Sequence, residues 1–270
     1  MKQSPLIVLA LLAAPLTIAA PAPAQVQNND IMSILARKAE TPPRPAPTTI
    51  PYSYRVSVDM TSQEGKDIEN YQADLRIDPS QPAGSRAQII SASHPESEAF
   101  LEFLEEVEDP EKDMAERADN FWCGSTESKD DSDPDFDLSD FEVVSETDTE
   151  ATIKPKAGRL AALLVQSDNT EDMGKQERKM MKKLLDRVDG EMTLAKPAGE
   201  LTSFRVTMTR PMTMMLIAKL KVMDMEQSCE LAPNGFYHVS HMNMNVEGKA
   251  LGSRFGQKMD IQVSELTPLP

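Results

Sequence analysis

Alternation of apolar and polar residues with a period of two is the feature of this sequence that most limits its fold. Residues 52–60, YSYRVSVDM, place Tyr, Val and Met at every second position, with Ser, Arg and Asp between them. Successive side chains of a strand point to opposite faces, so this pattern predicts a strand with one buried face. Residues 61–70 are expected to form a polar turn. The pattern then returns in YQADLRI (71–77) and RAQIISAS (86–93) and fills most of the last hundred residues. An antiparallel meander is expected.

Helical periodicity interrupts the strands. Within 96–121, Phe100, Leu104 and Val107 lie on one stripe, while Glu and Asp dominate the other face. A further helix is expected over 171–188. A short helix capped by Asn29 or Asp30 is expected before the proline-rich run 41–51, and the sequence leaves open whether this helix docks on the rest of the protein.

These patterns predict an α+β protein. Its core is expected to be a twisted antiparallel β-sheet of about eight to eleven strands, packed against two or three α-helices. We expect an entry helix and Pro-rich linker over 25–50. One β-rich domain follows over 51–270, with an acidic helix-loop insertion at 96–140.

Residues 1–24 have the features of a secretory signal peptide. Lys2 precedes an apolar stretch, and Ala22-Pro23-Ala24 is a small-x-small cleavage site, so we predict cleavage after Ala24. This stretch is too short for a membrane span, and no later stretch is long and apolar enough to cross a bilayer. A net charge of −16 argues against binding to nucleic acid. The signal peptide therefore predicts a periplasmic or secreted protein, and we expect it to be a monomer.

The two cysteines, Cys123 and Cys229, both follow the predicted cleavage site. Exported proteins mature in an oxidising compartment, where paired cysteines form disulfides. Neither cysteine has a neighbouring Cys or His at metal-ligand spacing. The sequence therefore predicts a structural disulfide between them.

The stretch HVSHMNMN (238–245) is the strongest candidate for a metal site. Thioethers and imidazoles bind Cu(I), and a strand would place His238 on one face with Met242 and Met244. However, His238 and His241 are three residues apart and would point to opposite faces. Methionine also fills irregular cores and lines adaptable cavities. We therefore predict no metal at this stretch.

The acidic run 125–140 contains a second candidate for a metal site. Its acidic residues Asp131, Asp133, Asp135, Asp137 and Glu142 have the spacing of calcium ligands in an EF-hand loop. Phe136 replaces the glycine that the sharp turn requires, and Pro134 lies beside it. A solvated acidic loop is the preferred interpretation.

Motifs for catalysis are absent. The chain has no GxSxG, HExxH or SxxK motif and no glycine-rich phosphate loop, and its third histidine, His94, has no evident partner. We predict that the protein is not an enzyme and needs no cofactor. A hydrolase is the least favoured alternative.

One part of the sequence is similar to a known family. A helix ending in LLDRVDG is followed by EMTLAKPAGELTSFRVTMTRP, with a hairpin at Lys196–Leu201. Together with the order of strands and helices over 52–266, this resembles the periplasmic lipoprotein-carrier proteins (the LolA/LolB-like group). The resemblance implies that the antiparallel sheet is curved into an unclosed barrel, an open half-barrel. It also implies that helices cover the concave side of the sheet and that an apolar cavity between sheet and helices takes acyl chains.

The predicted function is binding of an apolar ligand, a lipid or an acylated lipoprotein, between sheet and helices. The alternative is an envelope interaction or assembly protein without a ligand. A filled interface between sheet and helices would favour this alternative. The residues predicted to line the cavity are Tyr54, Val56, Leu75, Val206, Met208, Leu216, Leu220, Met242 and Met244 from strands, and Phe100, Leu104, Met181 and Leu185 from helices.

Overall fold

The computed structural model describes residues 30–39, 44–45, 47–109, 114–123, 138–156, 183–196, 198–214 and 218–270. Most of these residues belong to antiparallel strands, and the sheet is open. None of the described helices is long and apolar enough to span a membrane. The prediction of an antiparallel β-rich protein is confirmed at this level, while curvature into a half-barrel stays a prediction.

The chain divides into two compact units, each built from two stretches of sequence. Unit 1 comprises residues 1–46 and 124–202, and unit 2 comprises residues 47–123 and 203–270. Neither unit is one continuous block of sequence. The prediction of one domain over 51–270 stays a prediction.

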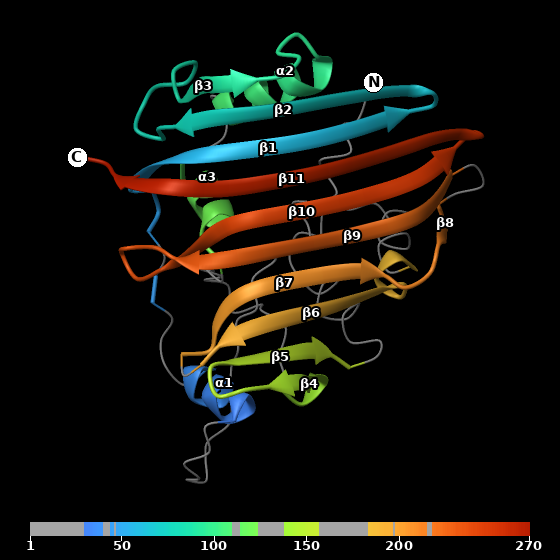
Figure 1. The fold of residues 1–270 in the computed structure, drawn as a ribbon. Helices are drawn as coiled ribbons and strands as arrows, with labels where there is room; N and C mark the ends of the chain where they lie inside the picture. The colour runs from blue at the N-terminus through green and yellow to red at the C-terminus, as the bar shows by residue number, and fades with distance from the viewer. Residues whose placement is uncertain are drawn as a thin grey trace. The chain divides into compact units, whose positions relative to one another are not determined.

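Unit 2 contains the long strands (Figure 1). Its order is β3-β2-β1-β11-β10-β9-β7, and β8 pairs with β9. The bounds are β1 (Tyr52–Glu64), β2 (Asp67–Ile77), β3 (Ala87–Ala92), β7 (Glu200–Met208), β8 (Met212–Met214), β9 (Ala218–Leu231), β10 (Tyr237–Ala250) and β11 (Ser253–Pro268). Strand β7 begins in unit 1 and continues in unit 2.

Two helices belong to unit 2: α2 (Glu98–Glu108) and α3 (Met114–Phe121). The Ser97 hydroxyl accepts a hydrogen bond from the Phe100 N–H and caps α2. Phe100 is fully buried and packs edge to face on Tyr71 of β2, with ring centroids 5.4 Å apart. The predicted apolar stripe of this helix therefore faces the sheet.

Unit 1 contains the antiparallel strands β4 (Phe141–Glu146), β5 (Glu150–Pro155) and β6 (Val188–Ala195), with β5 in the middle. The 3-10 turn η3 (Leu138–Asp140) precedes β4. Helix α1 (Ile31–Ala39) also belongs to this unit.

Helix α1 is docked on other parts of unit 1, whereas the sequence had left open whether this helix docks. A carboxylate oxygen of Asp30 accepts a hydrogen bond from the Ser33 N–H at 3.0 Å, so Asp30 is the cap. Ile31 is buried, and its N–H donates to the Glu146 carboxylate of β4 at 2.8 Å. Near the other end of the helix, Lys38 Nζ donates to the Gly199 carbonyl at 3.0 Å.

Two predicted element boundaries are wrong. Residues 61–70 were expected to form a polar turn, but only Gly65 and Lys66 separate β1 from β2. Backbone pairing along both strands, and the positive φ of 66° at Gly65, let the hairpin continue through polar residues. The helix predicted over 171–188 also ends too late, since Val188 begins β6; residues 171–182 lie outside the described residues.

The described residues of the segment 212–225 do not form one regular strand. Residues 212–214 form β8, which folds back on the start of β9. A bulge at Lys221 then reverses the alternation, because Leu220 pairs with Gly248 and Val222 with Glu247. Met223 is buried as a result.

Candidate functional site

A row of methionines crosses the middle of the sheet in unit 2. Met60 of β1 pairs with Met259 of β11, which pairs with Met244 of β10, which pairs with Met225 of β9. Tyr71 and Val206 extend the row at its two ends. Paired residues on adjacent strands share a face. The register therefore places four methionine side chains side by side, and we call these six residues the methionine row.

The methionine row is largely buried. Met244 is 2 % exposed, and Met225 and Met259 are also buried, whereas Met60 is half-buried. A parallel row beside it contains Val58, Ile261 and Met242. Flexible thioethers make such a surface adaptable in shape.

The opposite face of the same strands is polar. Asp74 accepts hydrogen bonds from Ser57 and from Arg55, the latter at 3.0 Å, and these bonds lower the pKa of its carboxyl group. Burial raises the pKa of Asp260, but hydrogen bonds from His241 at 2.8 Å and Asn243 at 3.2 Å outweigh it, so the net change is downward. The sheet of unit 2 therefore has one apolar and one polar face.

Five of the predicted cavity residues belong to one apolar cluster in unit 2. Phe100 and Leu75 are fully buried there, Val56 is buried, and Tyr54 and Leu104 pack against them. In the same unit, Val206, Leu220 and Met244 are buried on their strands, while Met208 and Met242 are half-buried.

The remaining predicted residues do not join this set. Leu185 is buried and belongs to unit 1. Leu216 and Met181 lie outside the described residues, as do residues 124–137, which carry four of the five acidic residues of the candidate calcium loop. The fifth acidic residue, Glu142, is in β4, and its carboxylate forms a salt bridge with Lys154 Nζ at 3.2 Å.

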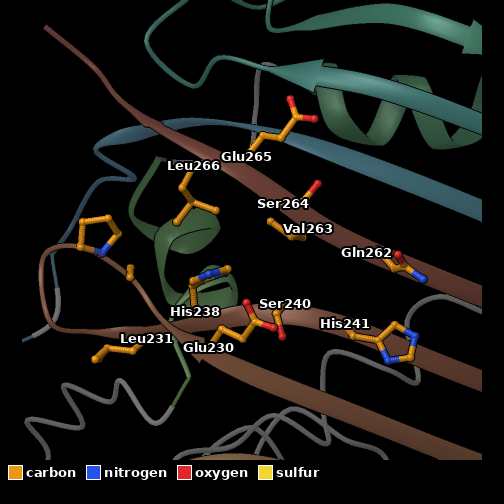
Figure 2. Close-up of a pocket in the computed structure, with 12 residues that line it drawn as sticks. Glu230, Leu231, His238, Ser240, His241, Gln262, Val263, Ser264, Glu265 and Leu266 are labelled. Carbon is orange, nitrogen blue, oxygen red and sulfur yellow. The ribbon is translucent and has the colours of Figure 1, made fainter.

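A pocket of about 510 Å³ lies where β10 and β11 separate (Figure 2). Their pairing ends at His241 and Gln262, although β10 begins at Tyr237 and β11 continues to Pro268. Beyond this point β10 stays paired with β9, and β11 stays paired with β1. The lining residues are Glu230, Leu231, Ala232, Pro233, His238, Ser240, His241, Gln262, Val263, Ser264, Glu265 and Leu266.

Two bulges separate these strands. In β10 the pairing with β9 jumps from Val239 to His241, so Ser240 is an extra residue. In β11 both Glu265 and Leu266 lie opposite a single β1 residue, Tyr54. Bulges bend a strand and redirect its side chains, and they are common beside functional sites.

Glu265 adopts a backbone conformation that is rare for a residue with a side chain. Its φ is 53°, and its carboxylate contacts Arg55 at 3.3 Å and Arg76 at 3.6 Å. A positive φ outside glycine costs on the order of 1 kcal/mol and is often found at functional sites. In Figure 2 this carboxylate points away from the pocket.

His238 is the most buried titratable residue of the pocket. It is 4 % exposed, and its ring stacks on Phe121 at the end of α3 with centroids 5.4 Å apart. Burial is the main effect that lowers the pKa of His238. Its Nδ1 lies 2.9 Å from the Val239 carbonyl, which only accepts hydrogen bonds, so Nδ1 carries the proton. Because its pKa is lowered from 6.5, the ring is neutral at pH 7, and the acceptor lone pair is then on Nε2.

The disulfide Cys123–Cys229, which the sequence predicted, lies beside this region, because Glu230 follows Cys229 in β9. The Cys123 N–H donates a hydrogen bond to the Tyr237 carbonyl at 2.8 Å. Trp122 pairs with His238 in an isolated antiparallel β-bridge. Val239 packs against both cysteines. The end of α3 is thus fixed to β9 and to the start of β10.

The two histidines of HVSHMNMN have different partners. His238 contacts Phe121 and the Val239 carbonyl, whereas His241 contacts Asp260. Within the described part of the chain, no group of three or more His, Cys, Asp or Glu side chains is placed to hold a metal ion. Ser240 donates to the Ser228 carbonyl at 3.2 Å rather than to a histidine.

The sequence did not identify either the methionine row or the pocket. Met60, Met225 and Met259 are far apart in the chain, and only the strand register aligns them. The alternating MDM (223–225) and MNMN (242–245) were the available signal. Bulges leave no signature in the residues themselves, so the pocket could not be anticipated.

Fold and site together describe an open antiparallel sheet with a methionine-rich face and a separate polar pocket. Comparison with protein-family models, with curated proteins and with solved structures gave no match for this chain.

Proposed function

We propose that this protein is exported and binds an apolar ligand, a lipid or the acyl chain of a lipoprotein, on the methionine-rich face of unit 2. The observation that carries the proposal is the methionine row, in which four thioether side chains lie side by side across β1, β11, β10 and β9. Such a surface can adjust its shape to chains of different length and bend.

Binding would be driven by burial of hydrocarbon. Each CH₂ group removed from water contributes about 0.8 kcal/mol, with no need for directional contacts. Polar groups would stay on the opposite face, where Asp74 and Asp260 are already hydrogen-bonded. The Cys123–Cys229 disulfide is compatible with the oxidising location that export requires.

Two adjacent residues of β10 provide the test. Met242 is half-buried on the methionine-rich face, and Asn243 is exposed on the polar face. Met242→Arg and Asn243→Arg add the same charge one residue apart. We expect Met242→Arg to stay folded, since the guanidinium can reach water along its stem, and to lose binding of an apolar fluorescent probe. Asn243→Arg should bind the probe like the wild type.

The outcomes are distinguishable by thermal unfolding and probe titration. If Met242→Arg unfolds the protein, the face is a filled core and the proposal fails, because an unpaired buried charge costs several kcal/mol. Equal loss of probe binding in both variants would also contradict it. If Met242→Arg stays folded and alone loses probe binding, native mass spectrometry of the wild-type protein from its own compartment would identify the bound lipid.

A second candidate function is strand-mediated interaction with another envelope protein. Among the described residues, β3 pairs only with β2, and its residues Ile89 and Ile90 are 46 % and 52 % exposed. An edge strand with exposed apolar residues suits pairing with a partner strand. Ile90→Lys should abolish capture of such a partner and leave probe binding unchanged.

A further inference from the structure

The pocket between the separated ends of β10 and β11 has a chemical character of its own. Among its twelve lining residues there is no lysine or arginine. An anionic ligand such as a phosphate or carboxylate would therefore find no cationic side chain on the wall. The polar groups that do line it are carboxylates, hydroxyls, an amide and two imidazoles.

The acceptors gather on one side of the pocket. Glu230 of β9 lies directly opposite His238 of β10 in the strand register. His238 presents the unprotonated Nε2, because its Nδ1 proton is used by the Val239 carbonyl. Ser240 uses its own proton on the Ser228 carbonyl, which leaves its oxygen lone pairs as acceptors. Figure 2 shows His238 and Ser240 projecting from β10 into the space between the strands.

The charge of Glu230 distinguishes it from the other carboxylate of the pocket. Glu265 is neutralised by Arg55 and Arg76 and points away. Glu230 is exposed and has no ion pair within 4.0 Å in the described part of the chain. The pocket therefore carries one uncompensated negative charge beside two neutral acceptors.

Apolar residues from β9, from the turn after it and from β11 form much of the rest of the wall. Leu231, Ala232, Pro233, Val263 and Leu266 contribute hydrocarbon to the wall, and Leu266 projects toward the ring of His238. A volume of about 510 Å³ is within the range of small-molecule sites, roughly 300–1,000 Å³. The matching ligand has a positive donor at one end and a short hydrocarbon at the other.

We propose that this pocket binds a primary alkylammonium group. Its three N–H groups donate hydrogen bonds to Glu230, to the Nε2 of His238 and to the hydroxyl oxygen of Ser240. A primary ammonium has three donors and no acceptor, which complements this set. Its source is either the amine headgroup of a lipid or a free amine. The inference does not depend on apolar binding at the methionine row.

The first experiment uses the full chain and n-butylammonium chloride at about pH 7.5, where an alkylamine is charged. Saturable chemical-shift changes at the amides of Glu230, His238 and Ser240 are expected, and n-butanol or an equal concentration of sodium chloride should not cause them. Charge-assisted hydrogen bonds are roughly twice as strong as neutral ones. Glu230→Gln should therefore weaken binding by about fivefold or more.

The matched control is Glu226→Gln, which makes the same change four residues earlier on β9 and outside the pocket. It should alter the affinity by less than about twofold, because exposed charges outside the site are screened. A second variant, Leu266→Trp, fills the pocket without changing charge and should abolish binding. The thermal unfolding of each variant shows whether it is folded.

Vesicles then distinguish the two sources of the amine. Binding to phosphatidylcholine vesicles that contain phosphatidylethanolamine, but not to pure phosphatidylcholine, and its loss in Leu266→Trp, would identify a lipid headgroup. Binding of n-butylammonium without vesicle binding would identify a free amine. No saturation by n-butylammonium, equal binding of n-butanol, or equal weakening by Glu226→Gln would overturn the proposal.

Discussion

The two ends of the β10–β11 hairpin show opposite behaviour. At the turn, Ala250 pairs with Ser253, and regular pairing continues without a bulge through Met244 and Met259 to His241. At the other end the strands separate, and a pocket opens between them. Unbroken register keeps every second side chain on the apolar face, whereas bulges bring polar side chains such as His238 and Ser240 into a buried position. The following predictions test this contrast.

The largest effect is expected from the disulfide at the open end. Cys123 and Cys229 are 106 residues apart, and in the loop-entropy model such a bridge contributes about 4–5 kcal/mol. Cys123→Ala with Cys229→Ala should lower the melting temperature by many degrees. Hydrogen exchange should show earlier loss of protection at 237–240 than at 244–250. Equal loss of protection at both ends would show that the bridge does not act locally.

The next effect is expected at the methionine row. Met244→Ala should destabilise the protein by about 2–5 kcal/mol, because Met244 is 2 % exposed and truncation of a buried side chain leaves a cavity. The neighbouring change Asn243→Ala, on the exposed face, should stay within about 1 kcal/mol. Urea unfolding of both variants measures the difference. Similar values for the two would mean that Met244 contributes no more to stability than an exposed residue of the same strand.

The pH dependence of the free energy of unfolding should reveal the lowered pKa of His238. Its pKa is lower in the folded protein than the ordinary value of 6.5, so the unfolded chain binds the proton more tightly. Stability is therefore full above about pH 6.5 and falls as the pH drops below it, until the folded pKa is reached. The loss is up to about 1.4 kcal/mol per pH unit in that window.

His238→Phe should remove this dependence between pH 6.5 and the lower pKa. His94→Asn, at a histidine that does not line the pocket, controls for the loss of a histidine as such. The carboxyl groups of Asp74 and Asp260 also have lowered pKa values, but their effect begins only as the pH falls below 3.8. A wild-type stability that is constant from pH 7 to 5, measured by urea unfolding, would contradict the prediction.

The smallest effect is expected at the closed end of the hairpin. Leu251 and Gly252 connect β10 to β11, and both have positive φ, 51° and 87°. Such a two-residue turn favours Asn-Gly, and Leu251 is also highly exposed. Leu251→Asn should raise stability by about 0.5–1 kcal/mol. A decrease in melting temperature would mean that Leu251 makes a stabilising contact.

The sequence by itself indicated most of the strands and, for several of them, which side is apolar. Alternation placed Val56, Leu75 and Val206 on buried faces, and helical spacing placed Phe100 and Leu104 toward the sheet. The disulfide was also predictable, since the sequence predicts export to an oxidising compartment, where an isolated pair of cysteines forms a bridge. These features follow from local periodicity and composition, which are properties of neighbouring residues.

Only the tertiary structure decided how the strands are aligned. Met60 and Met225 belong to one row because β11 and β10 lie between them in a fixed register, and nothing near either residue encodes that register. The same holds for the bulges at Ser240 and Glu265. A bulge is stable when pairing on both sides outweighs one unpaired residue, so its position depends on partners distant in the chain.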